Sequence, residues 1–157
     1  MRVAIASDIH GNKQAFQAVI AAAEADGAEE LWCLGDLVGY GAEPDACVAL
    51  AADHCAICLA GNHDLAVVDV LSLDDFSRGA ALAAQWTRDV ITPQTREYLL
   101  SLSPTGSSEG VGLFHASASV GRGAAASAER VGAAAGSASR GAVGVSPSRR
   151  SGDSPST

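Results

Sequence analysis

The first half of the chain alternates short apolar runs with longer amphipathic segments. Each apolar run is rich in β-branched or buried-type residues and is followed by polar or glycine-rich positions, a pattern typical of strands that end in loops. These runs span residues 2–7, 30–34 and 56–60. Helical patterns begin at Asn12 or Lys13 and at Pro44, and we expect them to end near Asp26-Gly27 and Asp53. Three strand–loop–helix units in succession predict a parallel sheet with right-handed crossovers.

The chain then becomes helical. Apolar residues spaced by three and four positions predict helices over 76–90 and 94–102. The expected buried anchors of these helices are Phe76, Leu82, Trp86, Tyr98 and Leu99. Residues 104–110 are expected to form a loop, and the apolar run 111–114 predicts a further short strand.

Beyond Ser117 the composition changes abruptly. Residues 118–157 are dominated by Ala, Ser and Gly and contain no Leu, Ile, Met, Phe, Tyr or Trp. Such a segment cannot bury enough apolar area to offset its ordering entropy, so we expect a disordered tail. Two origins are open: a natural flexible tail, or a reading frame lost near codon 118. The predicted folded domain therefore covers residues 1–117.

Composition narrows the class of protein. A length of 157 residues, of which 48% are hydrophobic, fits one ordinary globular domain. The run from Val3 to Ala6 is shorter than a signal-peptide core, and no stretch is long and apolar enough to span a bilayer, so we expect a cytoplasmic protein without membrane contact. The net charge is −8, although residues 118–157 hold five arginines against two acids. The negative charge of residues 1–117 repels a phosphate backbone, so binding to nucleic acid is not expected. Oligomeric state is left open.

The four cysteines are expected to be reduced, buried thiols. They are Cys33, Cys47, Cys55 and Cys58. Cys55 and Cys58 have the C-x-x-C spacing of redox pairs and half zinc sites, yet no second C-x-x-C follows, and the run lies on a predicted strand. A thiol-based function is therefore the weaker alternative.

Polar clusters follow four of the predicted strands. The clusters are Asp8-Ile9-His10, Gly35-Asp36, Gly61-Asn62-His63-Asp64 and His115. Because ligands bind at the carboxyl ends of parallel strands, these clusters can converge. In extended chain Asp8 and His10 would lie on one face. Carboxylate, amide and imidazole donors suit Mn, Fe, Zn or Ni and suit Ca poorly. Two such cations can share one carboxylate, and Asp36, flanked by glycines, is our candidate for that bridge. We expect Asp64 to cap the following helix.

Four motifs resemble the calcineurin-like metallophosphoesterase superfamily, and in particular its small bacterial phosphodiesterase-type branch. They are D-I-H-G-N at 8–12, G-D-L-V-G-Y-G at 35–41, G-N-H-D at 61–64 and F-H-A-S at 114–117. The resemblance covers about residues 1–117. It implies an α/β fold, α+β in some schemes, built as a four-layer αββα sandwich. It also implies two divalent transition metals, with Mn favoured, and hydrolysis of a small phosphomonoester or phosphodiester by a metal-bridging hydroxide.

The resemblance implies a role for each motif residue. Asp8, His10 and Asp36 would bind the first metal, and Asp36, Asn62 and His115 the second. Asn62 and His63 would contact the phosphate, and His63 would protonate the leaving oxygen as a general acid.

Two departures from the family pattern affect these expectations. Family members carry a later G-H-x-H motif that gives a histidine to each metal, whereas no histidine follows His115 here. The second sheet is accordingly expected to be incomplete. Some branches also carry Asp or Asn followed by Arg where this chain has Gly39 and Tyr40. The sequence thus predicts a metal-dependent phosphoesterase, with an inactive remnant that binds metal partially as the alternative.

Overall fold

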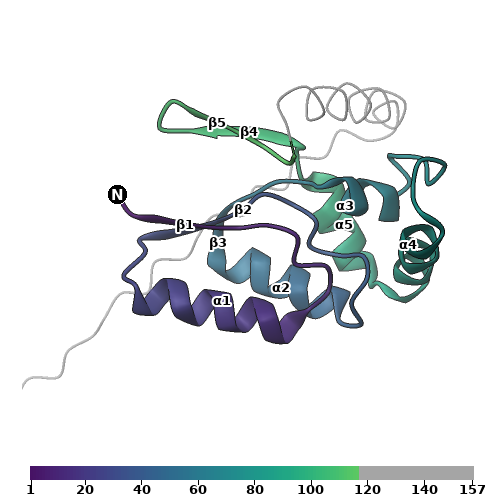
Figure 1. The fold of residues 1–157 in the computed structure, drawn as a ribbon, viewed down its shortest axis with the longest axis horizontal. Helices are drawn as coiled ribbons and strands as arrows, with labels where there is room; N and C mark the ends of the chain where they lie inside the picture. Colours follow the sequence, from purple (N-terminus) through teal and green to yellow (C-terminus); the bar gives the residue numbers. More distant parts are fainter. Residues whose placement is uncertain (117–157) are drawn as a thin grey trace, which may run out of the picture.

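The computed structural model describes residues 1–116, and its centre is a three-stranded parallel sheet (Figure 1). The strands are β1 (Val3–Ala6), β2 (Glu30–Cys33) and β3 (Cys55–Cys58), in the order β1-β2-β3. Both pairings are parallel, with Ala6 opposite Cys33 and Cys33 opposite Cys58. The predicted parallel sheet is confirmed, and the strands end within two residues of the predicted limits.

Two helices cover one face of this sheet (Figure 1). They are α1 (Lys13–Ala25) and α2 (Pro44–His54). Helix α1 begins where the Asn12 side chain accepts a hydrogen bond from the Ala15 N–H, and it buries Phe16 and Ile20 against the sheet. Helix α2 begins with Pro44, a residue suited to the first helical turn. The main apolar core lies between these helices and the sheet.

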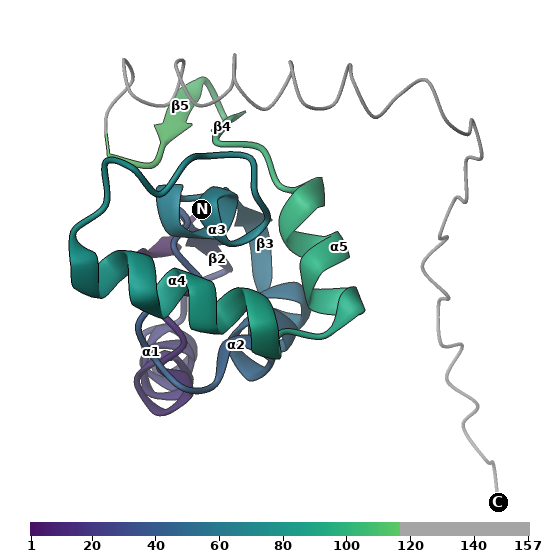
Figure 2. The ribbon, with the colours of Figure 1, turned by 90° about the vertical axis from the view of Figure 1, so that its right-hand side faces the viewer.

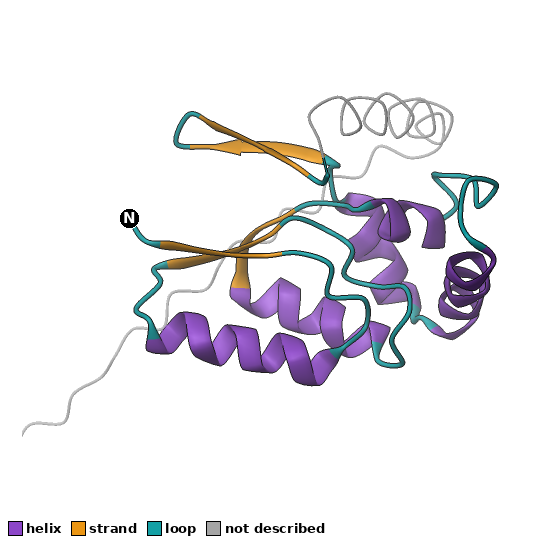
Figure 3. Ribbon diagram, in the orientation of Figure 1, coloured by secondary structure: helices purple, strands orange, loops and turns teal. Residues whose placement is uncertain are grey.

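A β-hairpin lies over the other face (Figure 3). It consists of β4 (Thr105–Ser108) and β5 (Val111–Phe114), paired antiparallel. The sequence-based loop over 104–110 is therefore wrong: Gly110 (φ 79°) forms the turn and the serines before it pair with β5. Leu113 packs with Trp32 and Leu59 in a second, smaller core. Within the described residues the second sheet has just these two strands, and Ile5 on β1 is 59% exposed.

Three further helices cluster at the carboxyl ends of the parallel strands (Figure 2). They are α3 (Asn62–Val67), α4 (Arg78–Val90) and α5 (Pro93–Ser101). Helix α3 occupies the segment expected to be a loop at 61–64, so that loop is reduced to Gly61. The described residues thus form mixed layers of helix and sheet.

The expected anchors of α4 and α5 are partly wrong. Leu82 and Trp86 are 56% and 43% exposed. Helix α4 instead buries the small residues Ala80, Ala84 and Thr87. This stripe of small side chains lets the helix approach its neighbours closely. Leu99 is fully buried as predicted, and Phe76 and Tyr98 are half-buried.

Residues 118–157, for which we expect a disordered tail, lie outside the described residues, and the structure does not test that expectation or the origin of the segment. Among residues 1–116, no helix has the length and apolar character needed to cross a bilayer.

Candidate metal centre

Four chain segments bring the candidate ligands to one place. The loop after β1 carries Asp8 and His10, the loop after β2 carries Asp36, α3 begins with Asn62, and His115 follows β5. Backbone hydrogen bonds join the first two loops: the Asp8 N–H donates to the Gly35 carbonyl and the His10 N–H to the Asp36 carbonyl. The convergence expected from strand order is therefore present in the structure.

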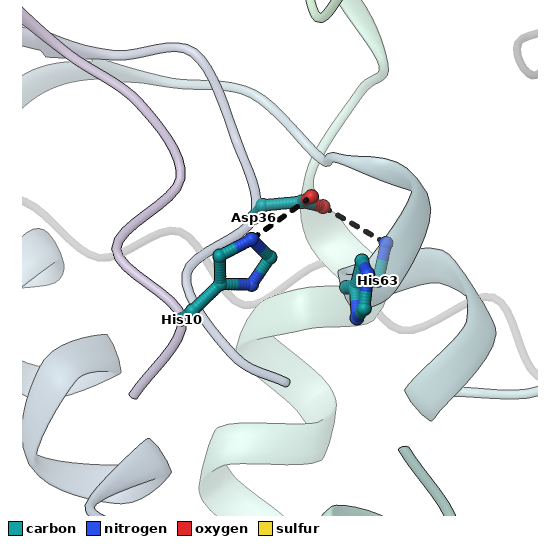
Figure 4. A group of neighbouring side chains, drawn as sticks. All are labelled: His10, Asp36 and His63. Carbon is teal, nitrogen blue, oxygen red and sulfur yellow. Dashed lines mark hydrogen bonds and ion pairs between the residues drawn. The ribbon is translucent and has the colours of Figure 1, made fainter. Parts of the chain in front are cut away.

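Asp36 lies at the centre of this cluster (Figure 4). Its side chain is almost fully buried, and Oδ1 accepts a hydrogen bond of 2.8 Å from the His63 backbone N–H. Oδ2 lies 3.8 Å from His10 Nε2 and 3.5 Å from His115 Nε2. One carboxylate oxygen is thus fixed by the backbone, and the other faces two imidazoles.

Both imidazoles are oriented by backbone carbonyl oxygens. His10 Nδ1 lies 3.1 Å from the Val38 oxygen, and His115 Nδ1 lies 2.9 Å from the Leu34 oxygen. A neutral imidazole that donates from Nδ1 keeps the Nε2 lone pair free, and this is the usual second interaction of a metal-binding histidine. In both residues the other ring nitrogen, Nε2, points toward Asp36.

Asp8 and Asn62 complete the cluster. Asp8 Oδ1 lies 3.7 Å from His10 Nε2, and Asn62 Oδ1 lies 3.2 Å from His115 Nε2. Asp8 and His10 do lie together, but the expectation that extended chain would place them on one face is wrong. Asp8 and His10 have φ angles of 57° and 50°, so left-handed backbone after the end of the strand brings them together.

The charges in the cluster are strongly coupled. Burial acts to raise the pKa of Asp36, but the contact with His115 outweighs it and holds the pKa below its usual value. The same contact raises the pKa of His115 to about 9, against the opposing effect of burial. In the metal-free chain a protonated His115 therefore balances the Asp36 carboxylate.

His63 lies at the edge of the cluster and is 6% exposed. Its Nδ1 atom is fully buried and makes no hydrogen bond with any described residue. The atom faces Gly39, where a Cβ would lie 2.8 Å from it, and Gly39 has a φ of 132° that other residues rarely adopt. Burial lowers the pKa of His63, so its neutral form predominates at neutral pH while no anion is bound.

The donors fit divalent transition metals. Two groups of side chains bring one ligand atom each to within 4.8 Å of one another, and Asp36 belongs to both. The groups are His10, Asp36 and His63, and Asp8, Asp36 and His115. Mixed oxygen and nitrogen donors, a shared carboxylate and an unpartnered buried nitrogen are the features that such metals satisfy.

Two positioning residues are revealed by the structure. The buried Asp64 carboxylate accepts hydrogen bonds from the Gly61 N–H at 2.9 Å and the Val38 N–H at 3.1 Å. The first is the helix cap that the sequence predicts, and the second ties α3 to the loop after β2. The buried Thr87 hydroxyl lies 3.0 Å from the Gly39 oxygen. A polar residue within the small-residue stripe of α4 is the signal that could have identified Thr87.

The four thiols belong to neither group of candidate metal ligands among the described residues. Cys33 and Cys47 are fully buried, and all four cysteines are unpaired. Burial raises the pKa of Cys55 to about 12, so its reactive thiolate is scarce at neutral pH. This environment favours structural thiols over the thiol-based alternative.

A family model described as calcineurin-like phosphoesterase matches residues 1–117. The chain belongs to the calcineurin-like phosphoesterase family. The match includes every candidate ligand named above. The mixed helix and sheet layers are those of the calcineurin-like metallophosphatase fold. The family also implies divalent metal ions, for which the Asp36 cluster offers candidate ligands.

Similar proteins support the assignment. A protein of Methanocaldococcus jannaschii named "Uncharacterized protein MJ0912" is 42% identical over 100 residues, which are 64% of this chain and 41% of that protein. A metallophosphoesterase from Sphaerobacter thermophilus superposes with a TM-score of 0.57 at 38% identity, over 69% of this chain and 44% of its own. A putative diadenosine tetraphosphatase also superposes with a TM-score of 0.57, at 28% identity, over 74% of this chain and 50% of its own. The chain thus spans half or less of the length of each of these proteins.

Proposed function

We propose that this chain hydrolyses the phosphoester bond of a small phosphomonoester or phosphodiester, with two divalent transition metals at the Asp36 cluster. The observation that supports this most directly is the position of Asp36 Oδ2, which faces the Nε2 atoms of both His10 and His115. Asp8, His10 and Asp36 would hold one metal, and Asp36, Asn62 and His115 the other. Mn²⁺ is our first choice among Mn, Fe, Zn and Ni. When bound, the metals would polarise the phosphoryl group and make water more acidic.

The protein groups would bind and orient the phosphate. Asn62 is exposed at the rim of the cluster, and its amide is within reach of a phosphate oxygen placed beside Asp36. His63 would contact the same phosphate and donate a proton to the leaving oxygen. Although burial lowers its pKa, a bound phosphate dianion favours the charged imidazole, so substrate would prepare His63 for this step.

Hydrolysis of p-nitrophenyl phosphate and bis(p-nitrophenyl) phosphate with added Mn²⁺ tests the proposal. Asp36→Asn keeps an oxygen for the His63 N–H but removes the oxygen that faces the imidazoles. We expect a larger loss of turnover than the ~10–100-fold that removal of an outer partner causes. Asp89→Asn, at an exposed carboxylate on α4, is the matched control and should retain full activity.

His63→Gln separates proton donation from metal binding. If His63 donates the proton, the variant keeps the wild-type metal content and loses more activity on phenyl phosphate than on p-nitrophenyl phosphate, whose leaving group needs less help. Loss of a metal would show that His63 is a ligand.

The alternative function is that of an inactive remnant with partial metal binding. It predicts no turnover and fewer than two metals per chain, as measured by elemental analysis of the purified protein. A folded, Mn²⁺-loaded sample that fails to turn over either substrate would contradict the proposed hydrolase.

A further inference from the structure

A pocket of about 670 Å³ lies beside the Asp36 cluster. Asn62 and His63 line the pocket next to the cluster, and the segment that leads into α4 adds Leu71, Ser72, Asp75, Phe76 and Ser77 to its lining. The volume falls in the range of small-molecule sites. A phosphate held by Asn62 and His63 would therefore have its ester substituent next to this pocket.

Two aromatic rings that line the pocket, Tyr40 and Phe76, lie next to His63. The Tyr40 ring centroid lies 4.9 Å from that of His63, and the Phe76 centroid lies 5.0 Å from it. Tyr40 is 56% exposed, although Leu37 and Val38 just before it are fully buried. An aromatic ring held by neighbouring rings, with its remaining surface open to a pocket, is suited to pack against a ligand ring.

The charge of the pocket limits what it can hold. Asp75 supplies a carboxylate, and Ser72 and Ser77 supply hydroxyl groups. Among the described residues, no Lys or Arg lines the pocket. A second anionic group on the substrate would meet Asp75 without a compensating cation, whereas an uncharged ring would not.

We propose that this pocket binds an uncharged aromatic group carried by the phosphate, so that the substrates are aromatic esters of a single phosphate and not oligophosphates. The inference rests on the proposed phosphoesterase function, because the phosphate at Asn62 and His63 fixes where the ring lies. Tyr40 and Phe76 are then specificity-determining residues, and Asp75 rejects further negative charge.

Phosphonates that cannot be hydrolysed test the pocket. Phenylphosphonate and methylphosphonate share the same anionic group and differ in the ring. We expect phenylphosphonate to bind the Mn²⁺-loaded chain more tightly, both as an inhibitor and by calorimetry. Tyr40→Leu and Phe76→Leu should each reduce that preference by about 2- to 10-fold, the range for one aromatic contact. Trp86→Leu, at an exposed aromatic residue on α4 outside the pocket, should leave the preference unchanged.

Asp75 is tested with 4-carboxyphenylphosphonate, which adds one negative charge to the ring. Wild-type protein should bind it more weakly than phenylphosphonate, and Asp75→Asn should remove most of that difference. Phe76→Leu is the more secure of the two ring variants, because Tyr40 also contacts His10, at 4.9 Å between ring centroids. Circular dichroism and metal content should match the wild type in every variant.

The two proposals fail in different ways. A chain that hydrolyses phosphoesters but binds phenylphosphonate and methylphosphonate equally would overturn the pocket proposal alone. A chain without hydrolysis would overturn the proposed function, and the calorimetric comparison of the two phosphonates would still decide the pocket. Unchanged preference in both Tyr40→Leu and Phe76→Leu would also contradict it.

Discussion

At the scale of single residues, the candidate metal centre is built on unusual backbone. Asp8, His10 and Asp36 have φ angles of 57°, 50° and 56°, in the left-handed region that non-glycine residues seldom occupy. Such conformations cost of order 1–3 kcal/mol each and persist where surrounding contacts enforce them. Here the backbone hydrogen bonds between the loops after β1 and β2 supply those contacts. The ligands are consequently held in place before any metal binds.

The buried Asp64 carboxylate joins α3 to the loop after β2, and this leads to a prediction about stability. In Asp64→Ala the N–H groups of Gly61 and Val38 lose their acceptor inside the protein. Each buried unpaired group costs ~1–3 kcal/mol, so we expect the free energy of unfolding to fall by at least ~2 kcal/mol. Urea denaturation followed by circular dichroism measures this. Asp74→Ala, at an exposed acid in the loop before α4, is the control, and equal midpoints for the two variants would contradict the prediction.

The sequence predicts the candidate ligands, but it does not predict the contacts of Asp64 and Thr87 that hold the surrounding loops in place. Asp8, Asp36 and Asn62 each follow an apolar run, so strand order alone places them at one edge of a sheet. The bond from Val38 to Asp64 joins residues 26 positions apart, and the contact of Thr87 with Gly39 spans 48 positions. Local patterns carry no information about such pairings, since they depend on how α3 and α4 pack.

At the scale of elements, the sequence predicts those helices and strands whose hydrophobic periodicity agrees with the turn and capping residues at their ends. The parallel strands and α1 and α2 were bounded by glycine, proline or capping residues. Strand β4 is not predicted because Thr105 is followed by Gly106, Ser107 and Ser108, small residues that are typical of turns. They pair because β5 offers a complete antiparallel partner. The sequence predicts the start of α3 too late, after Asp64, because the helix begins with Asn62, a residue typical of turns.

The exposed outer face of α4 gives a second prediction. Leu82 is 56% exposed, whereas Leu99 on α5 is fully buried in the main core. Leu99→Ala should lower the free energy of unfolding by about 2–5 kcal/mol, since it leaves a cavity. Leu82→Gln should change it by less than about 0.5 kcal/mol. Urea titrations of the metal-free variants measure both values. A large loss in Leu82→Gln would contradict the prediction that this face contributes little to stability.

At the scale of the whole molecule, the two faces of the parallel sheet differ. The helix side holds the main core, and the hairpin side holds a small cluster around Trp32, Leu59 and Leu113. The candidate metal centre lies where the loops of both layers meet, because β2 leads to Asp36 and β5 leads to His115. Metal binding would therefore tie the hairpin to the sheet, in addition to the apolar contacts of Leu113 and the contact of His115 Nδ1 with the Leu34 oxygen.

This link predicts that metal stabilises the whole fold. Because ligand atoms from both layers converge on Asp36, a metal that binds the folded chain should raise the free energy of unfolding by ~2.7 kcal/mol when its concentration is ~100 times Kd. Thermal or urea unfolding with and without Mn²⁺ measures this increase. It should disappear in Asp36→Asn and persist in Asp89→Asn.

Ca²⁺ separates specific binding from general charge screening. The chain carries a net charge of −8, so any divalent cation could stabilise it by reducing repulsion among its acids. Imidazole nitrogens are poor ligands for Ca²⁺, so a specific site at His10 and His115 should respond to Mn²⁺ and much less to Ca²⁺. Equal stabilisation by both cations, retained in Asp36→Asn, would assign the effect to screening and would remove the support for a metal centre that joins the two layers.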